Sequence, residues 1–258
     1  MTALVHTGLL TARQLRAFVR QPAYLAMNVV MPLIWLLLFG QLFKSVVDIP
    51  GFAGGQDYLA FLTPGIVMMM AISGSAWAGT TFIDDMNLGV MDRFLTSPTR
   101  RGALVVATML YQAVLTVMQT LIVVGVAWLV GARFEGGWAG VGVLLLAAVL
   151  LTLAFAALSN AVALLARTQT ALIGISQLLT LPLMFLSSAL IDTSLAPEWL
   201  QTAARYNPLE WAVRAGREAL RSSADWASVW LHLGLLAALA LVMTWLATLA
   251  FGSYQRSA

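Results

Sequence analysis

The chain has 258 residues, of which 60% are hydrophobic and only 10% are charged, and its mean hydropathy is +0.87. Soluble domains carry about 25% charged residues, so this composition excludes an ordinary soluble protein and indicates a membrane protein. The formal net charge is +3, but the 14 basic residues are dispersed without the clustered face of a nucleic-acid-binding protein, and there is no cysteine for a disulfide or a thiolate site.

The first segment, 1–22, is expected to form a cytoplasmic amphipathic helix. At 100° per residue, Arg13, Arg16 and Arg20 share one helical face. The apolar residues opposite them are Leu4, Leu15, Phe18 and Val19. This pattern is typical of a helix that lies in the membrane interface and leads into the first span. A frayed tail with juxtamembrane arginines is the alternative.

Six apolar stretches are long enough to cross the hydrocarbon core, which takes about 20 residues per helix. They are 23–43, 58–82, 103–130, 138–165, 170–190 and 227–251. Because the connections leave no room for a soluble domain, the sequence predicts an all-α integral membrane protein with residues 1–258 as one six-helix domain. Pro32 and Pro182 predict kinks in the first and fifth spans.

Basic residues near the spans predict the orientation. Eight arginines lie on the side of the N-terminus, at positions 13, 16, 20, 93, 100, 101, 167 and 256. Only Lys44 and Arg133 lie on the other side when the long loop 191–226 is set aside. Both termini are therefore expected in the cytoplasm, and the chain is expected in the cytoplasmic (inner) membrane as a multi-pass protein.

The cytoplasmic loop 83–102 concentrates charge between two uncharged spans. Its six charged residues, out of 25 in the chain, are Asp84, Asp85, Asp92, Arg93, Arg100 and Arg101. Leu88, Met91 and Leu95 recur there at helical spacing, as an apolar contact row requires. The loop is therefore a candidate contact surface for a soluble partner, in which charges set the orientation. A solvated connector between spans is the alternative.

The loop 191–226 is expected to form an extracytoplasmic helical hairpin between the fifth and sixth spans. Asn207 is placed to cap a helix that begins at Pro208. Glu210 and Arg214 have the spacing of an ion pair along one helix face. With a shorter helix near 197–206, these signals predict a hairpin that dips into the outer membrane surface, and a solvated loop of two helices is the alternative.

The spans contain few groups that could do chemistry. None of them contains Asp, Glu, Lys or Arg, which disfavours an ion- or proton-coupled transporter. An intramembrane hydrolase would have to use Ser73 or Ser75 with His232, and the small residues around these serines favour helix packing instead. A polar stripe in the third span, expected to form hydrogen bonds between helices, consists of Gln112, Thr116 and Gln119.

The sequence also lacks the means to hydrolyse ATP. A P-loop requires Gly-Lys followed by Ser or Thr, and the only lysine, Lys44, follows Phe43. We therefore expect no enzymatic activity in the chain by itself and no bound cofactor or metal. Any energy from ATP has to come from another chain.

Three motifs together resemble the membrane subunit of type-two ABC exporters, in the branch that exports drugs and nodulation factors. The first is Arg20-Gln21-Pro22 at the entry to the first span. Residues 88–101, LGVMDRFLTSPTRR, are similar to the family pattern Gly-x-x-x-Arg-Leu-x-x-x-Pro-x-x-Arg, with Phe94 where Leu is common. Residues 206–214, YNPLEWAVR, are similar to its Asn-Pro-Leu-x-x-x-Val segment. The resemblance extends over nearly the whole chain.

The resemblance implies a complex of two membrane subunits and two ABC ATPase subunits, with ATP and Mg bound by the ATPases. The second membrane subunit is either another copy of this chain or a related permease. The N-terminal helix and the loop 83–102 would dock on the ATPases. The residues expected at that contact are Arg13, Arg16, Asp85, Leu88, Met91, Asp92, Arg93 and Leu95.

The resemblance further implies that the second and fifth spans line the substrate path. The residues expected to line it are Met69, with Met68 and Met70 beside it, Ser73, Trp77, Gln177, Leu181 and Phe185. Methionines suit adaptable apolar contacts, and a path without charges suits hydrophobic or amphiphilic small molecules.

The expected function is that of a permease subunit in an ATP-driven exporter, embedded in membrane lipids. It would move drug-like molecules or lipids out of the cytoplasm or the inner leaflet. Two other interpretations stay open at this point. The same architecture could export a lipid-linked glycan or another envelope component, and the chain could be a membrane scaffold that transports nothing.

Overall fold

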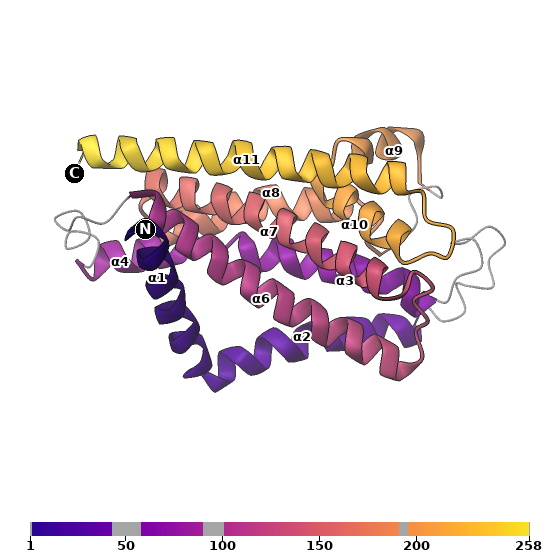
Figure 1. The fold of residues 1–258 in the computed structure, drawn as a ribbon. Coiled ribbons are helices and arrows are strands. Elements are labelled where there is room, and N and C mark those ends of the chain that lie inside the picture. The colour runs from indigo at the N-terminus through magenta and orange to yellow at the C-terminus, as the bar shows by residue number, and fades with distance from the viewer. Residues whose placement is uncertain (1, 43–57, 90–100, 191–195, 258) are drawn as a thin grey trace.

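The computed structural model describes residues 2–42, 58–89, 101–190 and 196–257, and their regular structure is helical (Figure 1). The helices are α1 Thr2–Val19, α2 Pro22–Leu42, α3 Tyr58–Ser75, α4 Thr80–Asn87, α6 Arg101–Val130, α7 Gly137–Ala166, α8 Gln169–Phe185, α9 Glu198–Arg205, α10 Pro208–Ala219 and α11 Trp226–Ser257. The long helices run side by side, whereas α1 crosses their direction at the end of the bundle where both termini lie (Figure 1). The helical fold class agrees with the sequence, and the position of α1 in the membrane interface stays a prediction.

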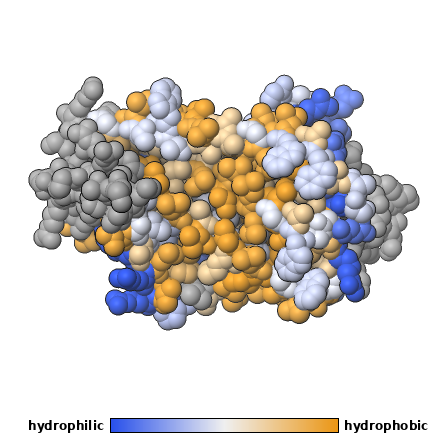
Figure 2. All heavy atoms as spheres, in the orientation of Figure 1, coloured by the Kyte–Doolittle hydropathy of each residue, from blue (hydrophilic) through white to orange (hydrophobic). Residues whose placement is uncertain are grey.

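The surface carries the polarity pattern of a protein that crosses a membrane. Figure 2 shows an apolar band across the middle of the molecule, with hydrophilic residues towards both ends. Within the described residues, four helical segments are long and apolar enough to span a bilayer: Tyr58–Asn87, Leu104–Val130, Gly137–Ala166 and Trp226–Gly252. The predicted first and fifth spans correspond to shorter apolar helices, Ala26–Leu42 and Gln169–Phe185. Six spans therefore stay a prediction.

Helix α7 occupies the centre of the bundle and packs against α11, α10, α6 and α3. Its buried side chains are largely small, with Ala147, Ala148 and Ala154 at most 1% exposed. Small residues let helix backbones approach closely, which replaces the hydrophobic driving force that is missing between helices in lipid. The alanine-rich sequence of α7 thus accounts for its central position.

Hydrogen bonds between side chains fix the helices of this core relative to one another. Thr116 and Thr152 join α6 to α7 through their hydroxyls at 2.8 Å, and Gln119 Nε2 donates to the Asn28 carbonyl of α2 at 2.7 Å. These two bonds confirm the predicted interhelical role of Thr116 and Gln119. In addition, Asn160 Nδ2 on α7 donates to the α6 hydroxyl Thr108 Oγ1 at 2.8 Å.

The predicted hairpin is present as α9 and α10, at the end of the bundle opposite the termini (Figure 1). Asn207 caps α10 by accepting from Leu209 N at 2.9 Å, and Pro208 begins the helix. Glu210 Oε1 pairs with Arg214 Nε at 2.6 Å, as its spacing predicted. Because α10 buries most of its apolar face against α7, α11 and α3, the hairpin is packed into the bundle.

The fifth predicted span, 170–190, is too long at its C-terminal end, since α8 stops at Phe185. Asn207 Nδ2 donates to the carbonyls of Leu183 and Leu186, at 2.7 and 2.8 Å. The Glu210 carboxylate then accepts from Ser188 N at 2.6 Å. Side chains of the hairpin therefore form hydrogen bonds with backbone groups of residues 183–190. In a continuing helix, these groups would have paired with one another.

Candidate functional site

The charged connection predicted at 83–102 begins as a helix. Helix α4 continues the second span as far as Asn87, after a break at residues 76–79. Asp84 and Asp85 thus stand on a regular helix rather than on a loop. Leu88, directly after α4, is 76% exposed, as a contact residue has to be. Met91, Asp92, Arg93 and Leu95 lie outside the described residues.

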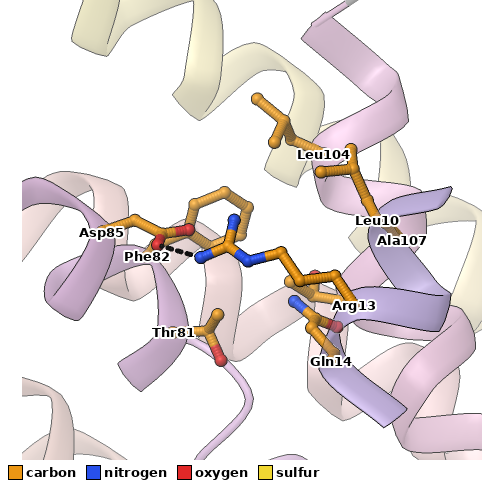
Figure 3. A pocket seen from close by; sticks show the side chains of 9 residues that line it. Leu10, Arg13, Gln14, Thr81, Phe82, Asp85, Leu104 and Ala107 are labelled. Carbon is orange, nitrogen blue, oxygen red and sulfur yellow. Dashed lines mark hydrogen bonds and ion pairs between the residues drawn. The ribbon is translucent and has the colours of Figure 1, made fainter. Parts of the chain in front are cut away.

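An ion pair connects α4 to the N-terminal helix, α1. Arg13 Nη2 donates to Asp85 Oδ1 at 3.2 Å across a gap between the two helices (Figure 3). The Asp85 side chain is only 14% exposed, whereas that of Arg13 is 54% exposed. An exposed ion pair contributes little, but a largely buried carboxylate needs its partner more. The structure therefore brings together two of the predicted contact residues, while Arg16 points outward as an exposed side chain.

The neighbouring carboxylate connects α4 to α8. Gln169 Nε2, at the first residue of α8, donates to Asp84 Oδ1 at 2.7 Å. The short turn before α8 bends at Arg167, whose φ of 56° is left-handed. Nothing in the local sequence pointed to Gln169, because its partner is 85 residues away. The two aspartates together form a double contact, which ties α4 to α1 on one side and to α8 on the other.

A small cavity of about 30 Å³ lies where α1, α4 and α6 meet. Arg13, Gln14, Thr81, Asp85 and Thr108 supply its polar lining (Figure 3). This is about the space that an internal water molecule requires, and the lining offers it several partners. The ion pair thus borders a cavity whose lining its polar neighbours share with apolar side chains, those of Leu10, Phe82, Leu104 and Ala107.

Helix α1 is held in place by a buried face that includes Phe18 of the predicted apolar face and two threonines that the sequence did not single out. Thr7, Thr11 and Phe18 are buried against the bundle, and Thr11 Oγ1 donates to Ala107 O of α6 at 3.3 Å. Phe18 also meets the Tyr111 ring edge-on at 6.4 Å. At 100° per residue this face lies opposite the arginine face and overlaps the predicted apolar face, so the helix docks on α6 through Phe18, while Arg13, Arg16 and Val19 are exposed.

The residues predicted for the substrate path lie on α3 and α8 and in the break after α3. Ser73 and Met69 are half-buried, and Trp77 is 43% exposed. On α8 the exposed side chains include Gln177, Leu181 and Phe185. Met68, by contrast, is fully buried in the core and does not reach a surface. The remaining set lies on protein surface and stays a prediction for the path.

Helix α8 contacts the rest of the bundle along only a narrow strip of its surface. Only Leu172, Ser176 and Thr180, spaced four residues apart, are buried along it. The rest of the helix, including the predicted path residues, is left open in this single chain.

The hydrolase alternative is not assembled among the described residues. The hydroxyls of Ser73 and Ser75 donate to carbonyls of their own helix, at 2.7 Å from Met69 O and Ala71 O. His232 Nδ1 bonds within α11, at 2.7 Å from Ser228 O. A nucleophile requires a base within hydrogen-bond reach, and each of these groups is instead engaged in its own helix.

Known proteins with similar sequences are transport permeases. The daunorubicin resistance ABC transporter permease protein DrrB1 of Streptomyces coeruleorubidus is 29% identical over 231 residues, which are 89% of this chain and 80% of that protein. The putative transport permease ycf38 of Cyanophora paradoxa is 30% identical over 209 residues, which are 80% of this chain and 71% of that protein. The probable doxorubicin resistance ABC transporter permease protein DrrC of Mycobacterium tuberculosis (strain H37Rv) is 24% identical over 214 residues, which are 83% of this chain and 76% of that protein. Residues 5–221 match the ABC-2 type transporter family model. The chain therefore belongs to the ABC-2 type transporter family.

Proposed function

We propose that the chain is the permease subunit of an ATP-driven exporter that moves hydrophobic or amphiphilic compounds out of the cytoplasm or the inner leaflet. ATP and Mg would be bound by two copies of a separate ABC ATPase subunit. Two of the relatives have daunorubicin or doxorubicin resistance in their names, which supports a lipophilic drug-like substrate. The absence of charge from the predicted spans supports the same class of substrate.

The observation that carries the proposal is the double contact of α4. Asp85 is bonded to Arg13 of α1, and Asp84 to Gln169 of α8. A partner that pushes on α1 or on the end of α4 therefore displaces α8 as well, since all three are joined by polar bonds.

The substrate path is proposed to run along the open faces of α3 and α8. Trp77 and Phe185 are exposed on this face, and Phe185 is 79% exposed. A second permease, either another copy or a related chain, would close the path from the other side. Aromatic and unbranched side chains would then contact the cargo without requiring an ion pair.

The proposal is tested by expressing the chain with the ABC ATPase from its own gene neighbourhood and reconstituting the pair in proteoliposomes. We expect the ATPase to co-purify with the permease, and daunorubicin to raise ATP hydrolysis and to be transported. If no ABC ATPase co-purifies, the proposed function is wrong.

The double contact is tested in the same preparation with Arg13→Ala. We expect a loss of up to about fivefold in daunorubicin-stimulated ATP hydrolysis, because an ion pair of this exposure contributes at most about 1 kcal/mol. Arg133→Ala, an exposed arginine at the turn between α6 and α7, is the control and should leave the rate unchanged. Exchanging the charges with Arg13→Asp and Asp85→Arg together should restore part of the loss, and equal rates for all variants would contradict the assignment.

A further inference from the structure

The predicted second span contains an interruption of the α-helix that its sequence does not predict. Helix α3 ends at Ser75 and α4 begins at Thr80. Between them, Ala78 N bonds to Ser75 O at 3.1 Å and Thr80 N to Trp77 O at 3.1 Å, a spacing of three residues instead of four. Thr80 N is therefore turned away from the carbonyl of Ala76, which it would meet in a continuous α-helix.

Two serines from other helices form hydrogen bonds with the backbone groups that the break leaves without a helical partner. Ser159 Oγ of α7 donates to Ala76 O at 2.7 Å and accepts from Gly79 N at 3.0 Å. Ser176 Oγ of α8 donates to the same Ala76 carbonyl at 2.8 Å. Both serines are buried, and an unpaired backbone group in the membrane interior costs several kcal/mol.

Gly79 is fitted to this arrangement. A Cβ at that position would collide with the backbone oxygen of Ser159 and lie 2.7 Å from the Ala163 Cβ. The chain at the break therefore lies directly on α7. A side chain of any size would have to lift it away.

A second arrangement would satisfy the same groups. If α3 and α4 joined into one helix, Thr80 N would pair with Ala76 O, and Gly79 N with Ser75 O. The two serine hydroxyls would then be free to bond carbonyls of their own helices, a common alternative for serine. Ser73 and Thr63 do so in this structure, towards Met69 O and Leu59 O. Two arrangements that each pair every group are what a two-state element requires.

We propose that residues 76–79 form a hinge of the transport cycle, with Ser159 and Ser176 as the positioning residues that hold its broken state. The proposal rests on the function proposed above and adds its internal mechanism. The bent chain keeps α4 on α7 and ties α8 to α3 through one shared carbonyl, that of Ala76. Straightening the chain releases Ser176, and with it α8, and turns the exposed Trp77 of the substrate path.

The hinge is tested first on the permease alone, in lipid nanodiscs. Because the chain has no cysteine, spin labels are placed at Asn87→Cys on α4 and Leu165→Cys near the end of α7, both exposed positions. Ser159→Ala leaves Gly79 N without its partner in the broken state, whereas the straight state loses only a hydroxyl that bonds within its own helix, so we expect the ratio of straight to broken molecules to rise roughly tenfold. The distance distribution between the labels should shift accordingly.

The matched control is Ser75→Ala, which lies next to the break and is equally buried. Its hydroxyl bonds only carbonyls of its own helix, at Ala71 and Ile72. We expect its label distances to equal those of the parent. If Ser159→Ala gives the same distribution as Ser75→Ala, the hinge is refuted, whatever the complex transports.

The second measurement is made on the complex with its ATPase, with daunorubicin as the probe. We expect Ser176→Ala to lower the amount of daunorubicin transported per ATP hydrolysed, and Ser75→Ala to leave this ratio at the parental value. A parental ratio for Ser176→Ala would overturn its positioning role. If the parent transports no daunorubicin, the proposed substrate is wrong, while the label distances in nanodiscs still decide the hinge.

Discussion

Asn207→Ala is the substitution with the largest expected effect on the hairpin, because one side chain holds two helices. Its Oδ1 accepts from Leu209 N at 2.9 Å and caps α10. Its Nδ2 donates to the carbonyls of Leu183 and Leu186, which ends α8. Loss of an N-cap costs about 1 kcal/mol. Loss of each buried hydrogen bond costs about 0.5–1.5 kcal/mol. The variant should therefore lower the free energy of unfolding by about 2–4 kcal/mol.

Two companion variants separate these contributions in equilibrium unfolding by SDS in mixed micelles. Asp225→Ala removes another cap, since Asp225 Oδ1 accepts from Ala227 N at 3.1 Å, and this side chain bonds only backbone groups at the start of α11. We expect it to lose only about 1 kcal/mol. Asn207→Ser keeps a capping oxygen and loses the two donated bonds, so its stability should fall between the other two. If Asn207→Ala is no less stable than Asp225→Ala, the cross-helix bonds contribute nothing and the explanation of where α8 ends is wrong.

Two further predictions use the same unfolding measurement. Gly65→Ala should cost about 1–3 kcal/mol, because its Cβ would collide with the Ala189 backbone, whereas Gly74→Ala on the same helix faces open space and should change stability by less than about 0.5 kcal/mol; equal effects would contradict the close approach at Gly65. In a double-mutant cycle, Thr116→Val and Thr152→Val should show a coupling of about 0.6 kcal/mol for their 2.8 Å bond, and additive effects would mean that the bond contributes no stability.

The features that could be predicted from the sequence are local along the chain. Asn207, Pro208 and Glu210 announce the start of α10 because a cap, a first-turn proline and a four-residue ion pair each depend on residues within one turn. The apolar stretches predicted the long helices for the same reason, since hydropathy is summed over consecutive residues. The C-terminal end of the fifth span was predicted wrongly because the residues that determine it are not local. The bonds that stop α8 come from Asn207 and Glu210, about 20 residues later.

The candidate site was only half predictable because its bonds join distant residues. The charges of Arg13 and Asp85 marked them as contact residues, but a sequence does not show that they pair across 72 positions. Gln169 carried no signal, and neither did the break at 76–79, where Ala-Trp-Ala-Gly contains no proline to end the helix. The backbone groups of such a break are paired by Ser159 and Ser176, and an isolated serine inside a long apolar stretch is typical of an ordinary helix.

The proposed path has no charges, so the position of α8, the helix proposed to line it, has to be set by other groups. Along most of α8 the neighbours are apolar, and lipid would replace them at little cost. Its position therefore depends on polar bonds at three levels: Gln169 to Asp84 at one end, Ser176 to Ala76 in the middle, and Asn207 to the carbonyl of Leu183 at the other end. The first two partners belong to α4 and to the break, and the third belongs to the hairpin. If the proposed hinge moves, a displacement of any one partner should shift α8, so the polar groups that hold this helix are also the groups through which we expect it to move.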